Sequence, residues 1–515
     1  MSDVGLRESL LREMPALAPL DGHNERLLQN AHPPGWVNPE PAGRYNLVVL
    51  GAGTAGLVSA AGAAGLGAKV ALVERHLMGG DCLNVGCVPS KALIRSARAA
   101  AEVRGAAAYG IDVPEGMRAD FAGVMERVRR LRAEISPNDS VRRFSDLGID
   151  VFLGEGRFSG PDRVEVGGRT LRFARAVIAT GARAAAPPIP GLAEAGYLTN
   201  ETLFTLTELP KRLVVVGAGA IGCEMAQAFA RLGSRVVLVE NARGILPRDD
   251  PDAARIVAEA LRRDGVEISC ATEIREARRA AGGEKSLVLD CDGKVEEILA
   301  DAILVAVGRA PNVEGLDLEA AGVSYDRGGV TVDDHLRTSN RRVFAAGDVC
   351  FRYKFTHTAD ALARIVIRNA LFFGRARASA LTVPWCTFTT PELAQVGLSE
   401  DEASQRGVAV EVLRLELRDV DRARLDGDQG LLKVVVKKGT DRILGATLVA
   451  HNAGDIISEV TLAIVGGAGL KTLAETIHPY PTQAEVLKRA GDAWNRARLT
   501  PLVRRLFRSL LAWRR

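Results

Sequence analysis

Residues 46–56 read NLVVLGAGTAG, and this stretch decides the fold of the first part of the chain. A short apolar run leads into glycines spaced GxGxxG. Small residues that suit a helix continue to Leu66, and a second apolar run, KVALVE, occupies 69–74. Strand, glycine turn, helix and strand in this order predict a βαβ unit of the dinucleotide-binding kind.

The same pattern recurs at 213–240. An apolar run at 213–216 precedes GAGAIG at 217–222, a helical stretch continues to about Leu232, and RVVLVE follows at 235–240. This internal repeat predicts two dinucleotide folds and therefore two bound dinucleotides.

The three glycines of each loop have separate tasks. The first allows a tight turn, the second lets the backbone approach a pyrophosphate, and the third lets the helix pack closely on the strand. The helix N-terminus then offers N–H groups to the phosphate. These glycines are Gly51, Gly53 and Gly56 in the first loop and Gly217, Gly219 and Gly222 in the second.

An acidic residue ends the second strand of each repeat, Glu74 in the first and Glu240 in the second. Such a carboxylate accepts a hydrogen bond from a ribose 2′-hydroxyl and repels a 2′-phosphate. Glu240 therefore predicts a preference for NADH over NADPH, although Arg243 and Arg248 follow closely enough in sequence to weaken it.

Two of the seven cysteines are close together, in GGDCLNVGCVPSKAL at 79–93. Cys82 and Cys87 are separated by four residues, about one helical turn, so their sulfur atoms can come within disulfide distance. Pro89 and the run after it predict that Cys87 lies at a helix start, where the helix dipole lowers the pKa of a thiol. With no second Cys/His pair nearby, a zinc-type site is disfavoured.

Composition narrows the functional class. The 515 residues are 47% hydrophobic and 25% charged, with a net charge of +4, which is ordinary for a globular protein and does not point to nucleic acid. Seven scattered cysteines do not make a secreted disulfide framework, no signal peptide opens the chain, and no apolar run approaches the ~20 residues of a spanning helix. We therefore expect a reducing, cytoplasmic setting.

The disulfide motif, the two glycine loops, AVGRAPN at 306–312 and VFAAGDV at 343–349 together resemble the FAD-dependent pyridine nucleotide–disulfide oxidoreductases. That family includes dihydrolipoamide dehydrogenase, glutathione reductase and mercuric reductase. The likeness covers about residues 44–495. It implies an α/β fold with two Rossmann-like domains, for FAD and NAD(P), a C-terminal α+β dimerisation domain, and a homodimer.

The predicted domain boundaries follow from this resemblance and from changes in the pattern of apolar and polar residues. After residue 380 apolar and polar residues alternate, as at 431–436 and 443–449, and a helical pattern begins at Ala453. The segments are an N-terminal extension at 1–43, an FAD-binding domain at 44–190 and 306–378, an NAD(P)-binding domain at 191–305, a dimerisation domain at 379–498 and a basic amphipathic helix at 499–515.

The resemblance also implies roles for single residues. Cys82 is the interchange thiol that meets the substrate, and Cys87 is the thiol next to the flavin. Lys91 and Glu224 match a Lys–Glu pair near flavin N5, although both also suit ordinary surface positions. The other positions assigned to cofactor binding are Gly80, Thr180, Gly181, Gly308, Gly347 and Asp348, the last against the ribityl chain of FAD.

Residues 477–485, IHPYPTQAE, depart from the pattern of dihydrolipoamide dehydrogenase and glutathione reductase. There a histidine of this segment completes the partner subunit's active site as the acid–base catalyst, and a glutamate orients it. Alignment on Pro481 and Glu485 puts Tyr480 at the position of that histidine, with His478 two residues earlier. A tyrosine with a pKa near ~10 is a poor proton shuttle at neutral pH, so either His478 replaces it or simple dithiol exchange is not the reaction.

Mercuric reductases carry tyrosine at this position, where it helps to bind Hg(II) between thiolates. The resemblance therefore favours a mercuric reductase-like enzyme that passes electrons from NADH or NADPH through FAD and the Cys82–Cys87 disulfide. The acceptor would be a soft metal ion, held transiently as Hg(II) by the two cysteines, or a disulfide. Three expected features are missing: the last residues contain no vicinal cysteine pair, the N-terminal extension contains no cysteine-containing metal-binding module, and Pro137-Asn138-Asp139-Ser140 stands where a second tyrosine is expected.

Two alternatives stay open. Dihydrolipoamide dehydrogenase is favoured by the disulfide motif and Glu240 and opposed by Tyr480. A membrane-associated, redox-sensing flavoprotein is suggested by LTPLVRRLFRSLLAWRR at 499–515, whose apolar and arginine faces suit an interfacial helix on anionic lipid. The same helix could instead dock on its own protein or on its dimer mate.

Overall fold

The structure is a computed structural model that describes residues 11–279 and 282–515. The chain forms two compact units. The first contains the described residues up to 217 together with 228–236 and 274–381, and the second contains 218–227, 237–273 and 382–515. Three elements continue from one unit into the other: α10 (Ala220–Leu232), β9 (Arg235–Val239) and β11 (Thr272–Arg279).

A seven-stranded sheet forms the centre of the first unit. Its parallel part has the order β3-β2-β1-β6, with β18 also parallel to β6, and an antiparallel meander extends the sheet in the order β6-β5-β4. β1 and β2 are buried over almost their whole length, as expected for strands covered on both faces. The strands are β1 (Arg44–Leu50), β2 (Val70–Glu74), β3 (Asp150–Leu153), β4 (Gly156–Gly160), β5 (Arg163–Val166), β6 (Arg169–Ile178) and β18 (Val343–Ala345).

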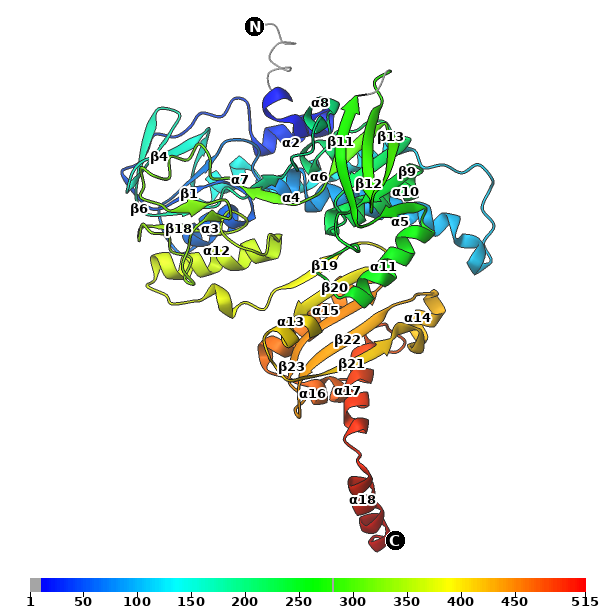
Figure 1. The fold of residues 1–515 in the computed structure, drawn as a ribbon. Helices are drawn as coiled ribbons and strands as arrows, with labels where there is room; N and C mark the ends of the chain where they lie inside the picture. The colour runs from blue at the N-terminus through cyan, green and yellow to red at the C-terminus, as the bar shows by residue number, and fades with distance from the viewer. Residues whose placement is uncertain (1–10, 280–281) are drawn as a thin grey trace. The chain divides into compact units, whose positions relative to one another are not determined.

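Helices cover this sheet. α3 and α12 pack against each other and contact its central strands, and Figure 1 shows them on the same side of β1, β6 and β18. The helices are α2 (Gly22–Ala31), α3 (Thr54–Gly65), α4 (Gly80–Asn84), α5 (Cys87–Arg104), α6 (Phe121–Ile135), α7 (Val141–Asp146), α8 (Leu192–Ala195), α9 (Asn200–Leu203) and α12 (Thr356–Leu371), with 3₁₀ turns η1 (Pro15–Leu17), η2 (Ala106–Tyr109), η3 (Ser136–Asp139) and η4 (Ala378–Ala380).

Further strands of the first unit belong to smaller sheets. β8 (Arg212–Val216) pairs in parallel with β14 (Ala302–Val305). The antiparallel elements are the sheet of β11, β12 (Lys285–Cys291) and β13 (Lys294–Ala300), the pair β7 (Ala182–Ala184) with β15 (Arg309–Pro311), and the pair β16 (Tyr325–Asp326) with β17 (Gly329–Val330).

The N-terminal extension contributes to the core of the first unit, although its sequence did not predict this. Asp21 caps α2 by accepting hydrogen bonds from the backbone N–H groups of His23 and Asn24. Leu17, Leu27, Leu28 and Ala31 are buried in the same apolar cluster as strands β1 and β2. Residues 14–31 are therefore a structural part of the first domain.

The second unit contains an antiparallel five-stranded sheet in the order β19-β20-β23-β22-β21. The strands predicted at 431–436 and 443–449 are present, and α15 begins at Ala453 as expected. The strands are β10 (Val266–Ser269), β19 (Pro384–Thr387), β20 (Glu392–Gly397), β21 (Val410–Glu416), β22 (Leu431–Lys437) and β23 (Ile443–Ala450). The helices are α11 (Pro251–Arg263), α13 (Glu400–Gln405), α14 (Asp421–Asp426), α15 (Ala453–Gly466), α16 (Leu470–Glu475), α17 (Glu485–Ala497) and α18 (Pro501–Trp513), with the 3₁₀ turn η5 (Leu417–Asp419).

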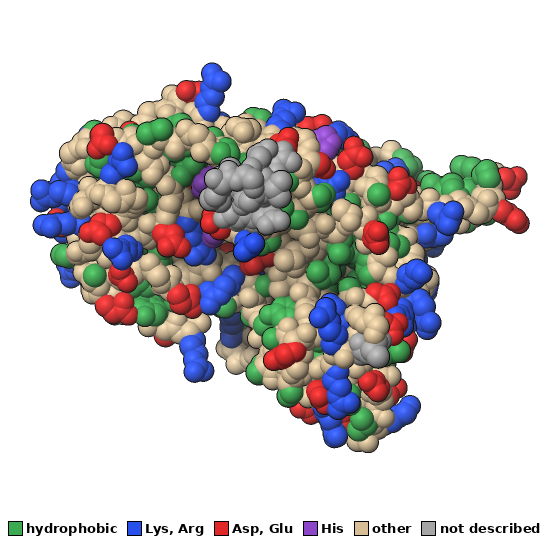
Figure 2. Space-filling view, turned by 90° about the horizontal axis from the view of Figure 1, so that it is seen from above, with side chains coloured by type: hydrophobic (Ala, Val, Ile, Leu, Met, Phe, Trp, Pro, Cys, Tyr) green, Lys and Arg blue, Asp and Glu red, His purple; other side chains and the backbone are tan. Residues whose placement is uncertain are grey.

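Two properties of the surface and the helices bear on function. In the view of Figure 2, Lys and Arg side chains are interspersed with Asp and Glu, so charge is not gathered into one patch on this face. Within the described ranges, no helix is both long enough and apolar enough to cross a membrane.

Candidate active site

The first glycine loop leaves space where a ligand would lie. A Cβ on Gly51, whose φ is +99°, would be 2.4 Å from Ala179 O, and a Cβ on Gly56 would be 1.8 Å from Gly51 O. These two glycines are thus required by the fold itself. At Gly53 a Cβ would have only Gly80 Cα nearby, at 3.8 Å. Gly53 is also the N-cap of α3, so the open space lies where the N–H groups of the first helical turn can bind a phosphate.

The second loop repeats this division. A Cβ on Gly217, at φ +97°, would lie 2.8 Å from Ala306 O, whereas a Cβ on Gly219 would have no described atom within 4 Å. Gly222 is buried within α10. The glycine positions therefore fit the predicted pyrophosphate contacts at both loops.

The acidic residues of the two repeats have matching hydrogen bonds. Glu74 accepts from the backbone N–H groups of Ala52, at 2.7 Å, and His76, at 2.8 Å. Glu240 accepts from those of Ala218, at 2.7 Å, and Ala242, at 3.0 Å. Each carboxylate is held beside its glycine loop and keeps acceptor capacity for a ribose hydroxyl.

The cysteine segment lies directly against the first glycine loop. The backbone N–H of Gly79 donates to Ala52 O at 2.9 Å. A Cβ on Gly80 would be 2.6 Å from Gly53 Cα, so glycine at this position permits the close contact. Because Gly80 is the first residue of α4, which carries Cys82, the fold fixes the thiol close to the predicted FAD site.

The two cysteines are free thiols whose side chains are in hydrogen-bond contact. Cys82 is half-buried on α4, and Cys87 is exposed as the first residue of α5, the helix start predicted for it. Cys87 Sγ also lies 3.3 Å from Thr356 Oγ1, at the first residue of α12. The hydrogen bond with Cys87, burial and the negative charge of Asp139 all raise the pKa of the Cys82 thiol.

Asp139 lies where the sequence lacks an expected tyrosine. It is the last residue of η3, and burial raises the pKa of its carboxyl above the ordinary value. Its Oδ2 would be 3.1 Å from a Cβ on Gly79, which places the carboxyl beside the segment that leads to Cys82. This position was not predicted to belong to the site.

Arg309 connects three parts of the first unit, and sequence analysis did not single it out. Its guanidinium forms ion pairs with Asp81 and with Asp348, whose Oδ2 lies 3.4 Å from Arg309 Nε. It also donates a hydrogen bond to Ala182 O. Burial raises the pKa of Asp348, against the opposing charges of Arg309 and Lys354. The position directly after Gly308 in AVGRAPN was the only available signal for this residue.

The predicted turn segments lie beside this cluster. Thr180 Oγ1 donates to Asn312 O at 2.7 Å, Asn312 N–H donates to Gly181 O at 3.0 Å, and β7 then pairs with β15. Three of the glycines predicted to bind a cofactor have positive φ angles that favour glycine: Gly181 at +68°, Gly308 at +143° and Gly347 at +85°.

Lys91 and Glu224 lie in different units. Lys91 is half-buried on α5, one helical turn after Cys87. Glu224 is only 4% exposed on α10 and accepts a hydrogen bond from the Phe388 N–H at 2.9 Å, so it is not a helix-surface carboxylate. Their pairing near flavin N5 stays a prediction.

Tyr480 is 71% exposed, and its hydroxyl donates to Asp421 Oδ2 at 2.9 Å. This hydrogen bond raises the pKa of Tyr480, which keeps the side chain a neutral phenol. Glu485 begins α17 and forms an ion pair with Arg489 at 2.9 Å, while its buried Oε2 has no hydrogen-bond partner among the described residues. Asp421, 59 residues from Tyr480 along the chain, was not predicted.

His478 is held by its own unit. Its Nε2 lies 3.1 Å from a carboxylate oxygen of Glu459 and its Nδ1 lies 3.2 Å from Thr476 O, and its side chain is 4% exposed. Both partners only accept hydrogen bonds, so both ring nitrogens of His478 face acceptor groups of their own subunit. That His478 replaces the acid–base histidine stays a prediction.

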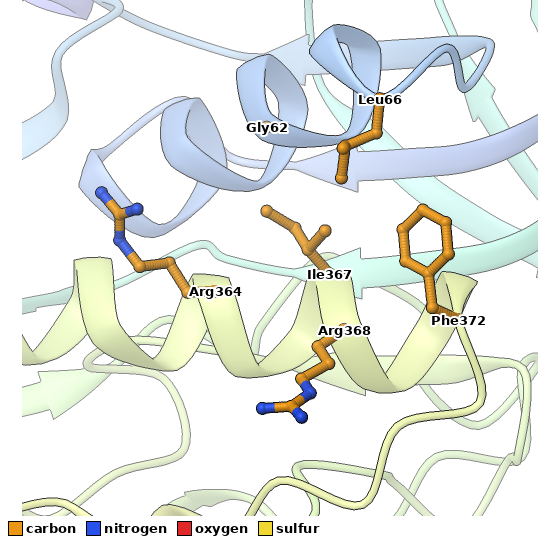
Figure 3. A pocket seen from close by; sticks show the side chains of 6 residues that line it. All are labelled: Gly62, Leu66, Arg364, Ile367, Arg368 and Phe372. Atoms are coloured by element: carbon orange, nitrogen blue, oxygen red, sulfur yellow. The ribbon is translucent and has the colours of Figure 1, made fainter.

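A separate hollow lies between α3 and α12, with a volume of about 480 Å³. Figure 3 shows Arg364 directed toward α3 and Arg368 directed away from it. Arg364 is already paired with Asp360 at 2.8 Å, and none of the predicted site residues lines the hollow. The lining residues are Gly62, Leu66, Arg364, Ile367, Arg368 and Phe372.

Comparisons with known proteins agree with this geometry. Residues 45–363 match the family model described as pyridine nucleotide-disulphide oxidoreductase, and 383–491 match its dimerisation domain. The chain is 37% identical over 448 residues to mercuric reductase from Bacillus cereus, covering 87% of this chain and 71% of that protein. It is 36% identical over 462 residues to dihydrolipoyl dehydrogenase from Thermus scotoductus, covering 87% and 97%.

A solved structure is similar over the same region. The HOCl-induced flavoprotein disulfide reductase RclA from Escherichia coli matches with a TM-score of 0.77 and 30% identity, over 87% of this chain and 99% of that one. A structure of RclA as a Cu(II) complex matches with the same TM-score.

Proposed function

Because the chain belongs to the pyridine nucleotide–disulphide oxidoreductase family, we propose that it is an NAD(P)H-dependent metal-ion reductase that acts through Cys82 and Cys87. Dependence on FAD and a nicotinamide nucleotide, and a homodimer, follow from the family. When bound, FAD supplies the transfer of an electron pair from the nicotinamide to sulfur. For Hg(II), the balanced reaction is NAD(P)H plus Hg²⁺ giving NAD(P)⁺, H⁺ and Hg⁰.

The observation that carries this proposal is the phenol of Tyr480 at the position of the acid–base histidine. Exchange with a disulfide or dithiol substrate requires a group that accepts or donates a proton at sulfur. Tyr480 is held neutral by its hydrogen bond to Asp421, so it is poorly suited to that task. A soft metal ion needs two thiolates as ligands and accepts electrons without a proton at the leaving group.

Two relatives support a soft metal as the acceptor. One is named for reduction of mercury, and RclA has been solved with Cu(II). Cys82 and Cys87 are in contact with each other, which suits two-coordinate binding of such an ion between the sulfur atoms. We assign Cys82, on α4, to the first encounter with the metal and Cys87 to the flavin side.

Residues of this chain would hold the cofactors as follows. FAD would lie with its pyrophosphate at Gly53 and the α3 N-terminus, a ribose at Glu74 and its ribityl chain at Asp348, whose position Arg309 fixes. The nicotinamide dinucleotide would lie with its pyrophosphate at Gly219 and a ribose at Glu240. Hydrogen bonds from the backbone N–H groups of Ala218 and Ala242 hold the Glu240 carboxylate at the loop. Because a carboxylate there repels a 2′-phosphate, NADH is the proposed donor.

The segment 477–485 is proposed to complete the active site of the partner subunit. Ile477 and Tyr480 are 93% and 71% exposed on their own subunit, which leaves them available to a partner. Lys91 and Glu224 are proposed to pair near the flavin. A reducing, cytoplasmic setting belongs to the same proposal, because the seven scattered cysteines do not make a secreted disulfide framework.

Dihydrolipoyl dehydrogenase is the second candidate. The relative from Thermus scotoductus, at 36% identity over 97% of its own length, favours it. Tyr480 opposes it, because dithiol oxidation needs a base at that position.

An anaerobic titration separates these candidates. The purified protein is reduced with one equivalent of NADH or NADPH, and the acceptors Hg(II), Cu(II), lipoamide and glutathione disulfide are then added singly. The proposal predicts fast reoxidation by a metal ion that is lost in Cys82→Ser, and slow reoxidation by both disulfides. Reoxidation by lipoamide at a rate equal to that of Hg(II) and Cu(II) would exclude the metal assignment.

A further inference from the structure

The segment 499–515 contains the helix α18 (Pro501–Trp513), whose residues are almost all exposed in the described chain. Thr500 caps α18 by accepting a hydrogen bond from the Val503 N–H at 3.4 Å, and Pro501 is its first residue, so the helix is started by its own sequence. None of its residues is buried. Figure 1 shows α18 beyond α17 and apart from the five-stranded sheet of its unit.

The helix has two distinct faces. At about 100° per residue, the large apolar residues fall on one half of the helix and the arginines Arg504, Arg505 and Arg508 fall together on the other. The apolar half remains exposed to solvent, with relative exposures between 48% and 82%. The exposed apolar residues are Leu502, Leu506, Phe507, Leu510, Leu511 and Trp513.

The preceding helix shows what a packed amphipathic helix of this chain looks like. α17 has the same length, and its apolar residues Val486, Leu487 and Trp494 are buried in the core of the second unit. Only Arg498 to Thr500 separate the two helices. The apolar face of α18 is therefore not part of the core of its own unit.

Charge indicates what covers this face. Five of the chain's 67 basic residues lie in 499–515 and none of its 63 acidic residues does, so that without the segment the net charge would fall from +4 to −1. A second copy of α18 could cover the apolar half but would leave the arginines without an anionic partner, because the segment contains no carboxylate. An anionic lipid surface instead offers phosphates to the arginines and an acyl boundary to the apolar half.

We propose that α18 binds the protein to anionic membranes by lying in the plane of the lipid surface. Its apolar half enters the headgroup–acyl boundary, and Trp513, 82% exposed at the end of the helix, lies at the interface where indole rings are favoured. The arginine half stays among the headgroups, where long side chains extend from an apolar stem to a charged end. The electron-transfer reaction of the protein would then take place beside a membrane.

The test is co-sedimentation of the FAD-containing protein with vesicles of phosphatidylcholine alone or of phosphatidylcholine with phosphatidylglycerol at three to one. The full chain is expected to sediment with the anionic vesicles only. The triple variant R504Q/R505Q/R508Q is expected to bind about a hundredfold more weakly, because each basic residue near an anionic surface strengthens binding about fivefold. L506S/L510S, which keeps every charge, is expected to lose binding as well.

A matched control removes three charges elsewhere. R142Q/R406Q/R424Q changes net charge by the same amount at exposed arginines outside α18, and it should bind like the full chain. Equal binding of the two triple variants would overturn the proposal, as would equal sedimentation with neutral vesicles. A version ending at Arg498 should keep its flavin absorbance and its mass in light scattering but not sediment. If the mass of that version instead fell to half that of the full chain, and the full chain did not bind the vesicles, α18 would be a subunit contact and the proposal would be wrong.

Discussion

Replacing Arg132 by methionine tests whether the N-terminal segment is a structural part of the FAD-binding domain. Arg132 is 1% exposed on α6. Its guanidinium donates to Asn84 O at 2.6 Å, Ala16 O at 3.1 Å and Asn24 Oδ1 at 2.7 Å. It therefore connects the helix end two residues after Cys82 to the segment before β1. Burial lowers the pKa of Arg132 to about 10, which still leaves it charged at neutral pH.

The magnitude follows from these contacts. A hydrogen bond to a charged group contributes about 1.5–3 kcal/mol, and three are lost, but the cost of burying the charge disappears with them. We expect a net loss of about 3–5 kcal/mol, because Asn84 O and the fully buried Asn24 lose donors that water cannot easily replace. For a domain of about 150–250 residues, in which 1 kcal/mol corresponds to about 2–4 °C, this is a fall in Tm of roughly 6–20 °C.

The assay is thermal release of bound flavin, followed by fluorescence, together with limited proteolysis of the N-terminal segment. Arg130→Met is the control, because Arg130 lies on the same helix but is exposed and paired with Glu134, a contact that contributes about 0.3–0.5 kcal/mol. The R132M variant should release flavin at a lower temperature and be cut within residues 14–31. Equal release temperatures for the two variants would refute the reasoning.

Three further predictions address the site itself. Asp139→Asn removes a negative charge that raises the pKa of Cys82. Alkylation of Cys82 in the dithiothreitol-reduced protein should therefore reach half its maximal rate at lower pH. An unchanged dependence of this rate on pH would contradict the assignment of Asp139 beside Cys82. Tyr480→His introduces a group that titrates near neutrality, and dihydrolipoamide oxidation by NAD⁺ should rise by about 10²-fold, whereas no gain would show that the proton shuttle is not what the site lacks. Glu240→Ala removes the carboxylate that repels a 2′-phosphate, so kcat/KM for NADPH relative to NADH should rise about tenfold; a constant ratio would remove Glu240 from donor selection.

The local parts of this structure were predictable because their causes are local. The glycines of each loop, the strands on either side and the acidic residue about twenty positions later lie within one βαβ unit, and short-range spacing is enough to recognise them. The position of Cys87 at a helix start followed in the same way from Pro89 and the residues after it.

The missed features depend on contacts between distant parts of the chain. Arg309 meets Asp81, which is 228 residues away, and Tyr480 meets Asp421 across 59 residues, so no spacing rule points to either pair. Residues 14–31 contain apolar side chains, but their spacing does not indicate what they pack on, and only the fold places Leu17 and Leu27 in the same buried cluster as residues of β1. Glu459, which lies beside the ring of His478, is 19 residues away along the chain and was not predicted either.

The central claim is that Cys82 and Cys87 carry the electron pair, and counting thiols tests it most directly. The protein is reduced anaerobically with one equivalent of NADH, and accessible thiols are titrated in the unfolded state before and after reduction. The account predicts a gain of two thiols in the wild-type chain and none in Cys82→Ser or Cys87→Ser. If the wild-type chain gained none while its flavin was bleached, electrons would stop at the flavin and the account would be wrong.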